Sequence, residues 1–169
     1  TMAISALAEL TILGDEIFTY ATRANKLTPT TFSNISNEKI KERNIGLDLP
    51  MLLSHTPSMV TTSDAGVGIG YTGMRIRGSD ATRINVTLNG IPINDSESHG
   101  VYWVNMPDLA SSLNKIQIQR GVGTSSNGAA AFGATVNMQS SGPSEKAFVQ
   151  IDNSFGSFNS WKSTVQFNT

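Results

Sequence analysis

The chain has 169 residues, a formal net charge of −1 and only 15% charged residues. A chain of this length normally forms one domain with one core. Ordinary soluble domains carry about 25% charged residues, so here Ser, Thr, Asn and Gly supply much of the surface through neutral hydrogen bonds. No basic stripe is present, which argues against nucleic-acid binding, because that depends on clustered Lys and Arg. The lack of cysteine excludes a disulfide framework and a thiolate metal site.

Residues 1–14 are mildly apolar and carry no strong structural signal. Ala6-Leu7-Ala8 has the small residues of a signal-peptidase site, but no basic segment precedes it. The sequence favours a linker or the end of a preceding domain over a signal remnant, and a first residue other than Met indicates an excised piece. No stretch approaches the roughly 20 apolar residues of a membrane helix.

The next elements are short. Residues 15–28 are rich in β-prone side chains without a clear partner strand, so we expect an extended, mobile segment that leads to Pro29. Thr30–Ile35 is predicted to be a strand. Ser36 is placed to be the N-cap of a helix over Asn37–Arg43.

A second short helix is predicted to begin after Asp48, which can cap it. Pro50 would lie in the first turn, where its missing N–H is harmless. We expect Pro57 to end this helix, and its buried stripe to consist of Leu49, Leu52 and Leu53. Ser58–Thr62 is then predicted to be a strand, and the four glycines within Gly66–Gly73 predict a flexible loop.

Two segments, Met74–Asp95 and Asn114–Met138, repeat one plan: a strand, an Arg-Gly corner and a glycine-containing turn. Both alternate apolar and polar residues at period two, which predicts strands with one dry and one wet face. Asn89-Gly90 predicts a type I′ hairpin turn, because both residues tolerate positive φ. Between the segments, a third short helix is expected over Pro107–Leu113, and it leads into a strand over Lys115–Gln119.

The pattern changes from Phe148 onward, after the turn signal Gly142-Pro143. On both sides of a Gly156-Ser157 turn, apolar residues alternate with polar ones: Val149, Ile151, Phe155, Trp161, Val165 and Phe167. A transmembrane barrel strand needs this arrangement over about 10 residues, apolar toward lipid and polar toward the lumen. The alternation on both sides of the turn predicts a β-hairpin, which by itself would seek a partner for its aromatic face.

Four motifs occur in a fixed order: Asp15–Arg23 with its Ala-Thr-Arg ending, Arg75–Gly78, Leu88–Ile93, and Gln119-Arg120-Gly121 followed by Gly128 and Gly133. They resemble the TonB box, the central strands and the last segment of the plug domain of TonB-dependent outer-membrane receptors. The resemblance runs from about Asp15 to the C-terminus. The chain departs from the family pattern at Val122, where the family usually has Pro, and at Ser126-Asn127, where it often has Leu-Tyr. In the box-like segment, Phe18 and Tyr20 replace smaller aliphatic residues.

The resemblance implies an α+β fold, in which a small mixed plug domain with a short central sheet and short helices precedes a β-hairpin from the start of a transmembrane β-barrel. Residues 1–24 would be an N-terminal extension with the TonB-box-like segment, 25–141 the plug and 142–169 the first strands of a barrel of about 22 strands. It further implies a bacterial outer-membrane location with a periplasmic N-terminus. The function would be gating the active import of a scarce solute such as an iron chelate, haem, cobalamin or glycan.

The resemblance also implies three sets of site residues. The TonB C-terminal domain would capture an extended segment by strand addition, through Asp15, Glu16, Ile17, Phe18, Thr19 and Tyr20. A small-molecule or glycan ligand would contact apical loops within 66–73 and 94–103, through Tyr71, Asn94, His99, Tyr102 and Trp103. Tyr102 and Trp103 have the equal alternative of roofing the core. Arg77 and Arg120 would meet acidic residues of the barrel wall, or be ordinary exposed arginines beside turns.

Other chemistry is less well supported. The glycine loop lacks the following helix and the Gly-Lys-Ser/Thr ending of a phosphate-binding loop. Asp95, Glu97 and His99 have cation-binding side chains, but a loop fixes their geometry poorly, so a solvated loop is favoured over a metal site. No nucleophile pattern accompanies either histidine, so no catalytic residue, metal or cofactor is predicted. The alternative function is a free-standing exported carbohydrate-binding or adhesive β-rich module with an aromatic contact face of Tyr102, Trp103 and Trp161.

Overall fold

The computed structural model describes residues 23–25, 27–122, 130–142, 146–157 and 159–168. The segment Asp15–Tyr20 lies outside the described residues, and so does Gly128. By its contacts the chain divides into two compact units. The first comprises the described residues up to Asn34 together with Arg75–Val101 and Ile116–Gln139, and the second comprises Ile35–Met74, Tyr102–Lys115 and the described residues from Ser140 onward. The single core expected from chain length is thus divided between two units.

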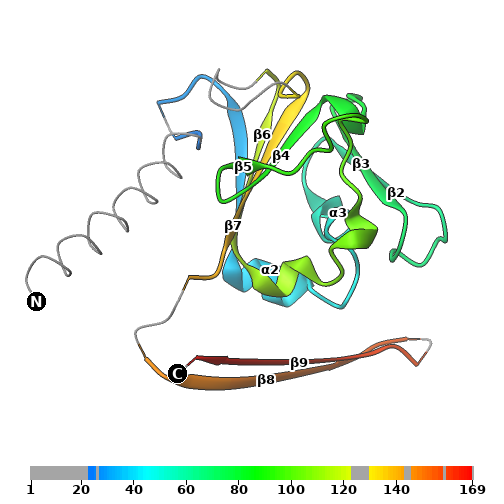
Figure 1. The fold of residues 1–169 in the computed structure, drawn as a ribbon, viewed down its shortest axis with the longest axis vertical. Helices are drawn as coiled ribbons and strands as arrows, with labels where there is room; N and C mark the ends of the chain where they lie inside the picture. The colour runs from blue at the N-terminus through cyan, green and yellow to red at the C-terminus, as the bar shows by residue number, and fades with distance from the viewer. Residues whose placement is uncertain (1–22, 26, 123–129, 143–145, 158, 169) are drawn as a thin grey trace, which may run out of the picture. The chain divides into compact units, whose positions relative to one another are not determined.

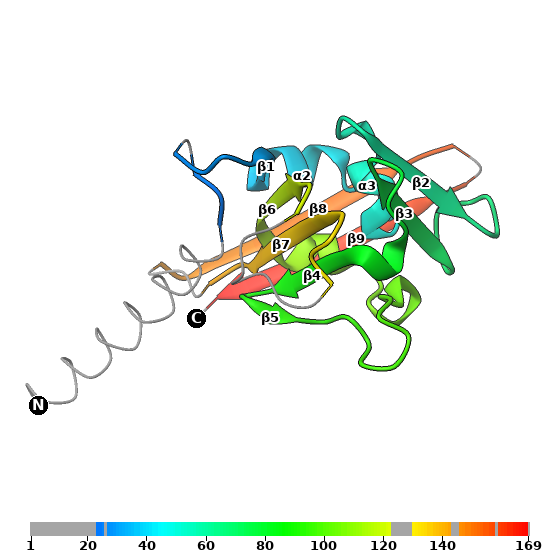
Figure 2. The ribbon, with the colours of Figure 1, turned by 90° about the horizontal axis from the view of Figure 1, so that it is seen from above.

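A five-stranded sheet forms most of the first unit. Its order is β1-β6-β7-β4-β5, with β1 at Thr31–Ser36, β6 at Leu113–Arg120, β7 at Ala134–Ser140, β4 at Ile84–Leu88 and β5 at Ile91–Pro92. Figures 1 and 2 show β6, β7 and β4 side by side in this sheet. β4 and β7 are parallel, and Ile84 pairs with Ala134 and Leu88 with Met138.

The predicted hairpin turn at Asn89-Gly90 is confirmed. Leu88 pairs with Ile91 across antiparallel strands β4 and β5, and the two turn residues have φ of 52° and 82°. Positive φ at both central positions is what a type I′ turn requires. The sequence therefore located this turn correctly from two residues.

The prediction that the central strands have one wet face is wrong. Six polar residues in the middle of β4, β6 and β7 are as buried as the apolar ones, each less than 5% exposed: Asn85, Thr87, Gln117, Gln119, Thr135 and Asn137. Many of them bond to one another, as when Thr87 Oγ1 donates to Asn137 Oδ1 at 2.7 Å. Among the described residues, Thr135 Oγ1 is buried without a partner. A neutral polar layer is tolerated inside a protein when its members are hydrogen-bonded.

The second unit contains the short helices. Helix α2 spans Asn37–Arg43, as predicted, and buries Ile40; Ser36 stands at its N-cap but makes no side-chain capping bond. Helix α3 spans Leu49–Leu52 and continues as the 3₁₀ helix η1, Leu53–His55, so it ends before Pro57. Its three predicted leucines are buried, at 5% exposure or less: Leu49, Leu52 and Leu53.

The predicted helix over Pro107–Leu113 is not formed. The chain makes two 3₁₀ helices instead, η3 at Trp103–Asn105 and η4 at Leu109–Ser112. Asp108 between them has a left-handed φ of 52°, which interrupts a right-handed helix. A further 3₁₀ helix, η2 at Ala81–Arg83, precedes β4 in the first unit.

The glycine loop joins β2, Met59–Ser63, to β3, Thr72–Ile76, in a two-stranded sheet. Its base is fastened to Asp48, whose carboxylate accepts from Gly70 N at 3.0 Å and from Thr72 Oγ1 at 2.9 Å. Gly68 N–H bonds to Ser63, and a Cβ at Gly68 would meet Leu47 at 3.1 Å. The loop is therefore held at several points along its length.

Strands β8, Phe148–Phe155, and β9, Trp161–Asn168, form the predicted C-terminal hairpin, seen as a long two-stranded ribbon in Figure 1. Within the described part of the chain, none of the helices combines the length and apolar character needed to cross a membrane.

Candidate functional site

The first Arg-Gly corner is a tight turn at the end of β3. Arg77 and Gly78 have φ of 52° and 76°, and Ser79 N donates to Ile76 O at 3.0 Å. Positive φ at both positions explains the glycine, because L side chains are strained there. The exposed Arg77 side chain donates to the Arg120 carbonyl at 3.3 Å. The two Arg-Gly motifs, far apart in sequence, thus meet within the first unit.

Gly133 joins three segments at this corner. Its N–H donates to Arg83 O at 2.9 Å, and its carbonyl accepts from Gly121 N at 2.8 Å. A Cβ at Gly133 would lie 2.2 Å from Ser79 Cβ, a distance that excludes any side chain. Gly121 has a φ of 107°, which also favours glycine. Of the glycines of the second motif, Gly133 is thus required by its close approach to Ser79 and Gly121 by its positive φ.

A cavity of about 600 Å³ in the first unit is lined by Thr82, Arg83, His99, Ala130 and Phe132. One wall is joined to the sheet, since the carbonyl of Arg83 accepts from Gly133 N. Phe132 is 68% exposed, and within the described residues Arg83 forms no ion pair. A guanidinium, an imidazole and an open aromatic ring around one cavity suit an anionic group carried on a flat apolar body.

Asn94 fastens its loop to β4. Its Oδ1 accepts from Val86 N at 2.8 Å, and its Nδ2 donates to the carbonyls of Ile84 and His99, both at 2.9 Å. These bonds hold His99, which has a left-handed φ of 57°, at the cavity wall. Of the ligand residues predicted in this loop, His99 therefore lines the cavity and Asn94 positions the loop.

Asp95 is engaged in a turn of the same loop. Its Oδ2 accepts from Ser98 N at 2.7 Å, Ser98 Oγ at 2.9 Å and Glu97 N at 3.2 Å. The hydrogen bond from the Ser98 backbone, supported by the others, lowers the pKa of Asp95. No group of three His, Asp or Glu side chains that could hold a metal ion occurs among the described residues. The geometry favours the solvated-loop interpretation of Asp95, Glu97 and His99.

The three aromatic residues predicted to contact ligand belong to the second unit. Tyr71 is 67% exposed and Tyr102 is 50% exposed. Trp103 is only 4% exposed, and this burial favours its alternative role in the core. Tyr71 and Tyr102 are therefore the accessible members of this set.

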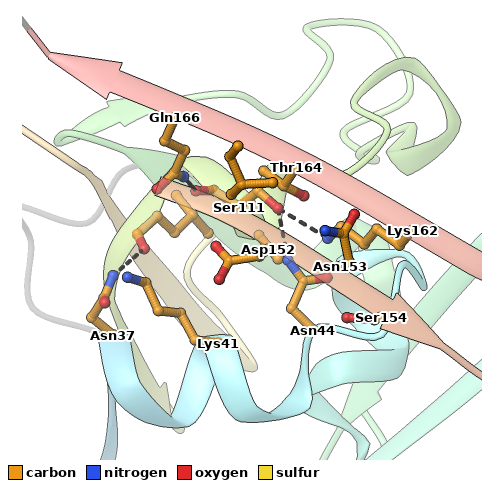
Figure 3. A pocket seen from close by; sticks show the side chains of 13 residues that line it. Asn37, Lys41, Asn44, Ser111, Asp152, Asn153, Ser154, Lys162, Thr164 and Gln166 are labelled. Carbon is orange, nitrogen blue, oxygen red and sulfur yellow. Dashed lines mark hydrogen bonds between the residues drawn. The ribbon is translucent and has the colours of Figure 1, made fainter. Parts of the chain in front are cut away.

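The polar face of the β8–β9 hairpin bonds to α2 and to the η4 segment, all within the second unit. Lys162 Nζ donates to Asp108 Oδ1 at 2.5 Å and to Ser111 Oγ at 3.0 Å, and Gln166 Nε2 donates to Ser111 O at 2.8 Å. From α2, the Lys41 ammonium reaches Gln150 at 3.4 Å. Figure 3 shows Lys162, Gln166 and Asn44 converging on Ser111 around a polar cavity of about 380 Å³.

Asp108 is the centre of this network. Partial burial acts to raise the pKa of its carboxyl group, but hydrogen bonds from Lys162, Ser111 and Asn44 outweigh burial and lower it. The left-handed backbone at Asp108 also separates η3 from η4. Asp108 is therefore ionised at neutral pH and holds Lys162 by a charge-assisted bond.

The opposite face of the hairpin is apolar and exposed. Across the two strands Val149 pairs with Phe167, Ile151 with Val165 and Phe155 with Trp161. All six side chains are at least 60% exposed. A contiguous apolar face of this kind marks a surface that contacts a partner or lipid. The hairpin thus has one face bonded to the rest of the second unit and one face exposed.

Sequence reasoning missed Asp108, Ser111 and Asn44 as partners of the hairpin. The alternation of apolar and polar residues after Gly156-Ser157 marks Lys162 only as one of the polar residues. Asp108 is 54 positions from Lys162 and 64 from Asn44. No spacing rule links residues at such separations, so no signal in the single sequence could have found this cluster.

The family model described as the TonB-dependent Receptor Plug Domain matches residues 24–135. The chain belongs to this family, which confirms the resemblance drawn from the ordered motifs. Membership implies location at an outer membrane.

Solved structures share the fold. The chain is similar to the receptor FpvA of P. aeruginosa in complex with heterologous pyoverdines, with a TM-score of 0.67 and 16% identity over 84% of this chain and 18% of that chain. It is similar to the ferric yersiniabactin uptake receptor FyuA from Yersinia pestis, with a TM-score of 0.64 and 13% identity over 86% and 22%. The ferric-catecholate import receptor Fiu from E. coli K12 gives 0.63 and 20% identity over 84% and 19%.

At these identities the likeness concerns the fold, and the predicted α+β architecture of a plug with a central sheet and two short α-helices is confirmed. The chain spans about a fifth of the length of these receptors. No curated protein matches it.

Proposed function

We propose that this chain is the gate of a TonB-dependent outer-membrane receptor that imports a scarce solute. The observation that carries the proposal is the two-faced hairpin that follows the plug sequence: its polar face is bonded to the second unit through Lys162 and Gln166, and its apolar face is open. A barrel strand is polar toward the lumen and apolar toward lipid. Residues 142–169 then begin the barrel, and 25–141 fill its lumen.

The N-terminal extension, 1–24, would face the periplasm. We propose that the TonB C-terminal domain captures Asp15, Glu16, Ile17, Phe18, Thr19 and Tyr20 as an added strand, because an extended segment can supply main-chain hydrogen bonds to an open sheet edge. Force along the chain would then reach the plug from its N-terminal side. Ligand bound on the opposite side would alter the exposure of this segment, which is a coupling between two sites.

In the first unit, His99 would contact the transported solute. The exposed Tyr71 and Tyr102 of the second unit are separate proposed ligand contacts, each considered by itself. The cavity beside Arg83 and Phe132 supports an anionic ligand, and similar structures include siderophore receptors. We therefore place an iron chelate first among the solutes considered. Arg77 and Arg120 remain the proposed contacts with acidic groups of the barrel wall, where a planar guanidinium suits carboxylates.

The TonB-box-like segment is tested by capture of the full-length receptor on immobilised TonB C-terminal domain. Ile17→Pro removes a backbone donor from the proposed strand, and Ile17→Val keeps both the backbone and the β-branched shape. We expect wild type and Ile17→Val to be captured and Ile17→Pro to be lost. Equal capture of all three would remove the proposed box.

Transport is tested separately in cells that lack the chromosomal receptor gene and carry a plasmid copy. Growth on a candidate iron chelate should depend on both the plasmid and TonB. Growth that needs the plasmid and persists without TonB would contradict gating by TonB.

A further inference from the structure

Gln117 is a buried amide on β6 with every hydrogen-bonding position filled. The side chain is 3% exposed. Its Oε1 accepts from Ala24 N at 2.8 Å and from Gln119 Nε2 at 3.0 Å, and its Nε2 donates to Ala24 O at 2.9 Å and to Asn34 Oδ1 at 2.8 Å. A primary amide has two donors and two principal acceptor positions. All four are used here, within the first unit.

Two of these bonds form a closed pair with the backbone of Ala24. The amide receives the N–H of Ala24 and donates to its carbonyl, as two residues do in a hydrogen-bonded pair of an antiparallel ladder. Ala24 belongs to no strand. The chain that enters the plug is thus joined to β6 by one side chain rather than by a ladder of backbone bonds.

The residues on either side of Ala24 add few other attachments to the sheet. The Arg23 guanidinium donates to Gln139 at 3.2 Å in a partly buried bond. After Ala24 the chain closes on itself: Leu27 N donates to Asn25 Oδ1 at 2.8 Å, and Thr28 N donates to Asn25 O at 3.0 Å. Strand β1 begins only at Thr31. The pair formed by Ala24 and Gln117 therefore joins this part of the chain to β6 through buried hydrogen bonds.

We propose that Gln117 is a positioning residue that sets how readily the N-terminal segment is released from the plug. Ala24 follows Tyr20, the last residue of the proposed TonB-binding segment, by four positions, so in chain order a displacement from that side reaches this pair before β1. Its release strands a buried amide without two of its partners, which is costly. The proposal rests on the proposed function for its biological meaning, while the link itself stands on geometry.

The link is tested by trypsin cleavage after Arg23 in the purified full-length receptor, followed by mass spectrometry. The Arg23–Ala24 bond fits a protease only when this segment leaves β6. Gln117→Met removes all four bonds at similar volume. Gln166→Met is the matched control, because Gln166 also donates to a backbone carbonyl, at Ser111 in the second unit. We expect cleavage to be about tenfold faster in Gln117→Met and unchanged in Gln166→Met.

Amide exchange separates release from general unfolding. The Ala24 amide should lose protection in Gln117→Met, and the β4 amides of Val86 and Leu88 should keep theirs. Ala24→Pro is the independent second variant, since it removes the N–H while leaving Gln117 in place; we expect it to expose Leu27 and Thr28 to faster exchange. Unchanged cleavage in Gln117→Met, or equal loss of protection in β4, would overturn the link.

Capture of the receptor on immobilised TonB C-terminal domain tests the role of Gln117 in TonB binding. If release limits binding, Gln117→Met should be captured about tenfold more tightly than wild type, because a larger fraction is competent to bind. Faster cleavage with unchanged capture would show that release does not limit binding and would overturn a role for Gln117 in TonB capture. If wild type itself is not captured, the proposed function fails, and the cleavage result alone decides whether Gln117 anchors the segment.

Discussion

The five-stranded sheet and the β8–β9 hairpin carry the same alternation of apolar and polar residues, yet the two regions use it in opposite ways. In the sheet the polar side chains are buried and bond to one another, as Thr87 does with Asn137. In the hairpin the apolar side chains are exposed, as Ile151 is opposite Val165. Alternation sorts side chains onto two faces. It does not say which face meets water.

The attachments of the two regions also differ in chemistry. Gln117 holds the N-terminal segment through neutral amide bonds in a buried site. Lys162 holds the hairpin through the charge of Asp108, which is 38% exposed. Neutral buried bonds respond little to pH or salt, whereas exposed ion pairs respond to both. Four substitutions test the differences between the sheet and the hairpin.

Gly133→Ala should have the largest effect. The added Cβ would lie 2.2 Å from Ser79 Cβ, so the corner of the sheet must move, at a cost of about 3 kcal/mol in the free energy of unfolding. The hairpin provides the control: a Cβ at Gly156 would meet Ser160 at an ordinary 3.6 Å. Urea unfolding of both variants should give a large shift for Gly133→Ala and a shift within about 0.5 kcal/mol for Gly156→Ala.

Thr87→Val tests the buried polar layer. It removes the donor to Asn137 Oδ1, and a buried bond lost in this way costs about 1–3 kcal/mol. A double-mutant cycle with Asn137→Ala measures the coupling between the two side chains. In the hairpin, Gln150→Ala removes an exposed amide that bonds to Lys41 and Asp152, and we expect almost no change. Equal losses in the two regions would contradict the contrast.

Asp108→Asn tests the charged attachment through pH. The pKa of Asp108 is lowered from its ordinary value of 3.8, so the pair's stabilisation is fully present above that value. It is lost as the pH falls through the lower pKa of the folded state. Because the pair is partly exposed, we expect about 0.5–1 kcal/mol. Asn tolerates the left-handed backbone, so unfolding measured from pH 7 to pH 2 should be less steep in the variant.

Ile151→Asn should have the smallest effect on stability in water, within about 0.5 kcal/mol, because the side chain is 62% exposed. Its effect should appear in partitioning of the chain into detergent micelles, which we expect to fall. Thr164→Asn, on the polar face, serves as the control and should leave partitioning unchanged. Equal partitioning of both variants would argue against a lipid-facing role for the apolar face.

Much of the fold could be predicted from local patterns. Helix α2 was located by a cap-type residue at its start, the turn at Asn89-Gly90 by its glycine, and both hairpin strands by alternation; these signals span only a few residues. The family followed from the order of the motifs. The expected helix over Pro107–Leu113 failed because Asp108 adopts a left-handed backbone that also aims its carboxylate at Lys162, a partner 54 positions away.

The sequence by itself determined helix α2, the hairpin turn at Asn89-Gly90, the alternating strands and the membership in the plug family, since these depend on neighbours in the chain and on the order of the motifs. The tertiary structure decided three things: the burial of the polar sheet residues, the exposure of the apolar hairpin face, and the pairing of Gln117 with Ala24. The burial and the pairing are contacts between segments distant in sequence, and the exposure is the lack of such a contact among the described residues. The free energy of each depends on which surfaces exclude water together. A single sequence carries no local record of those contacts.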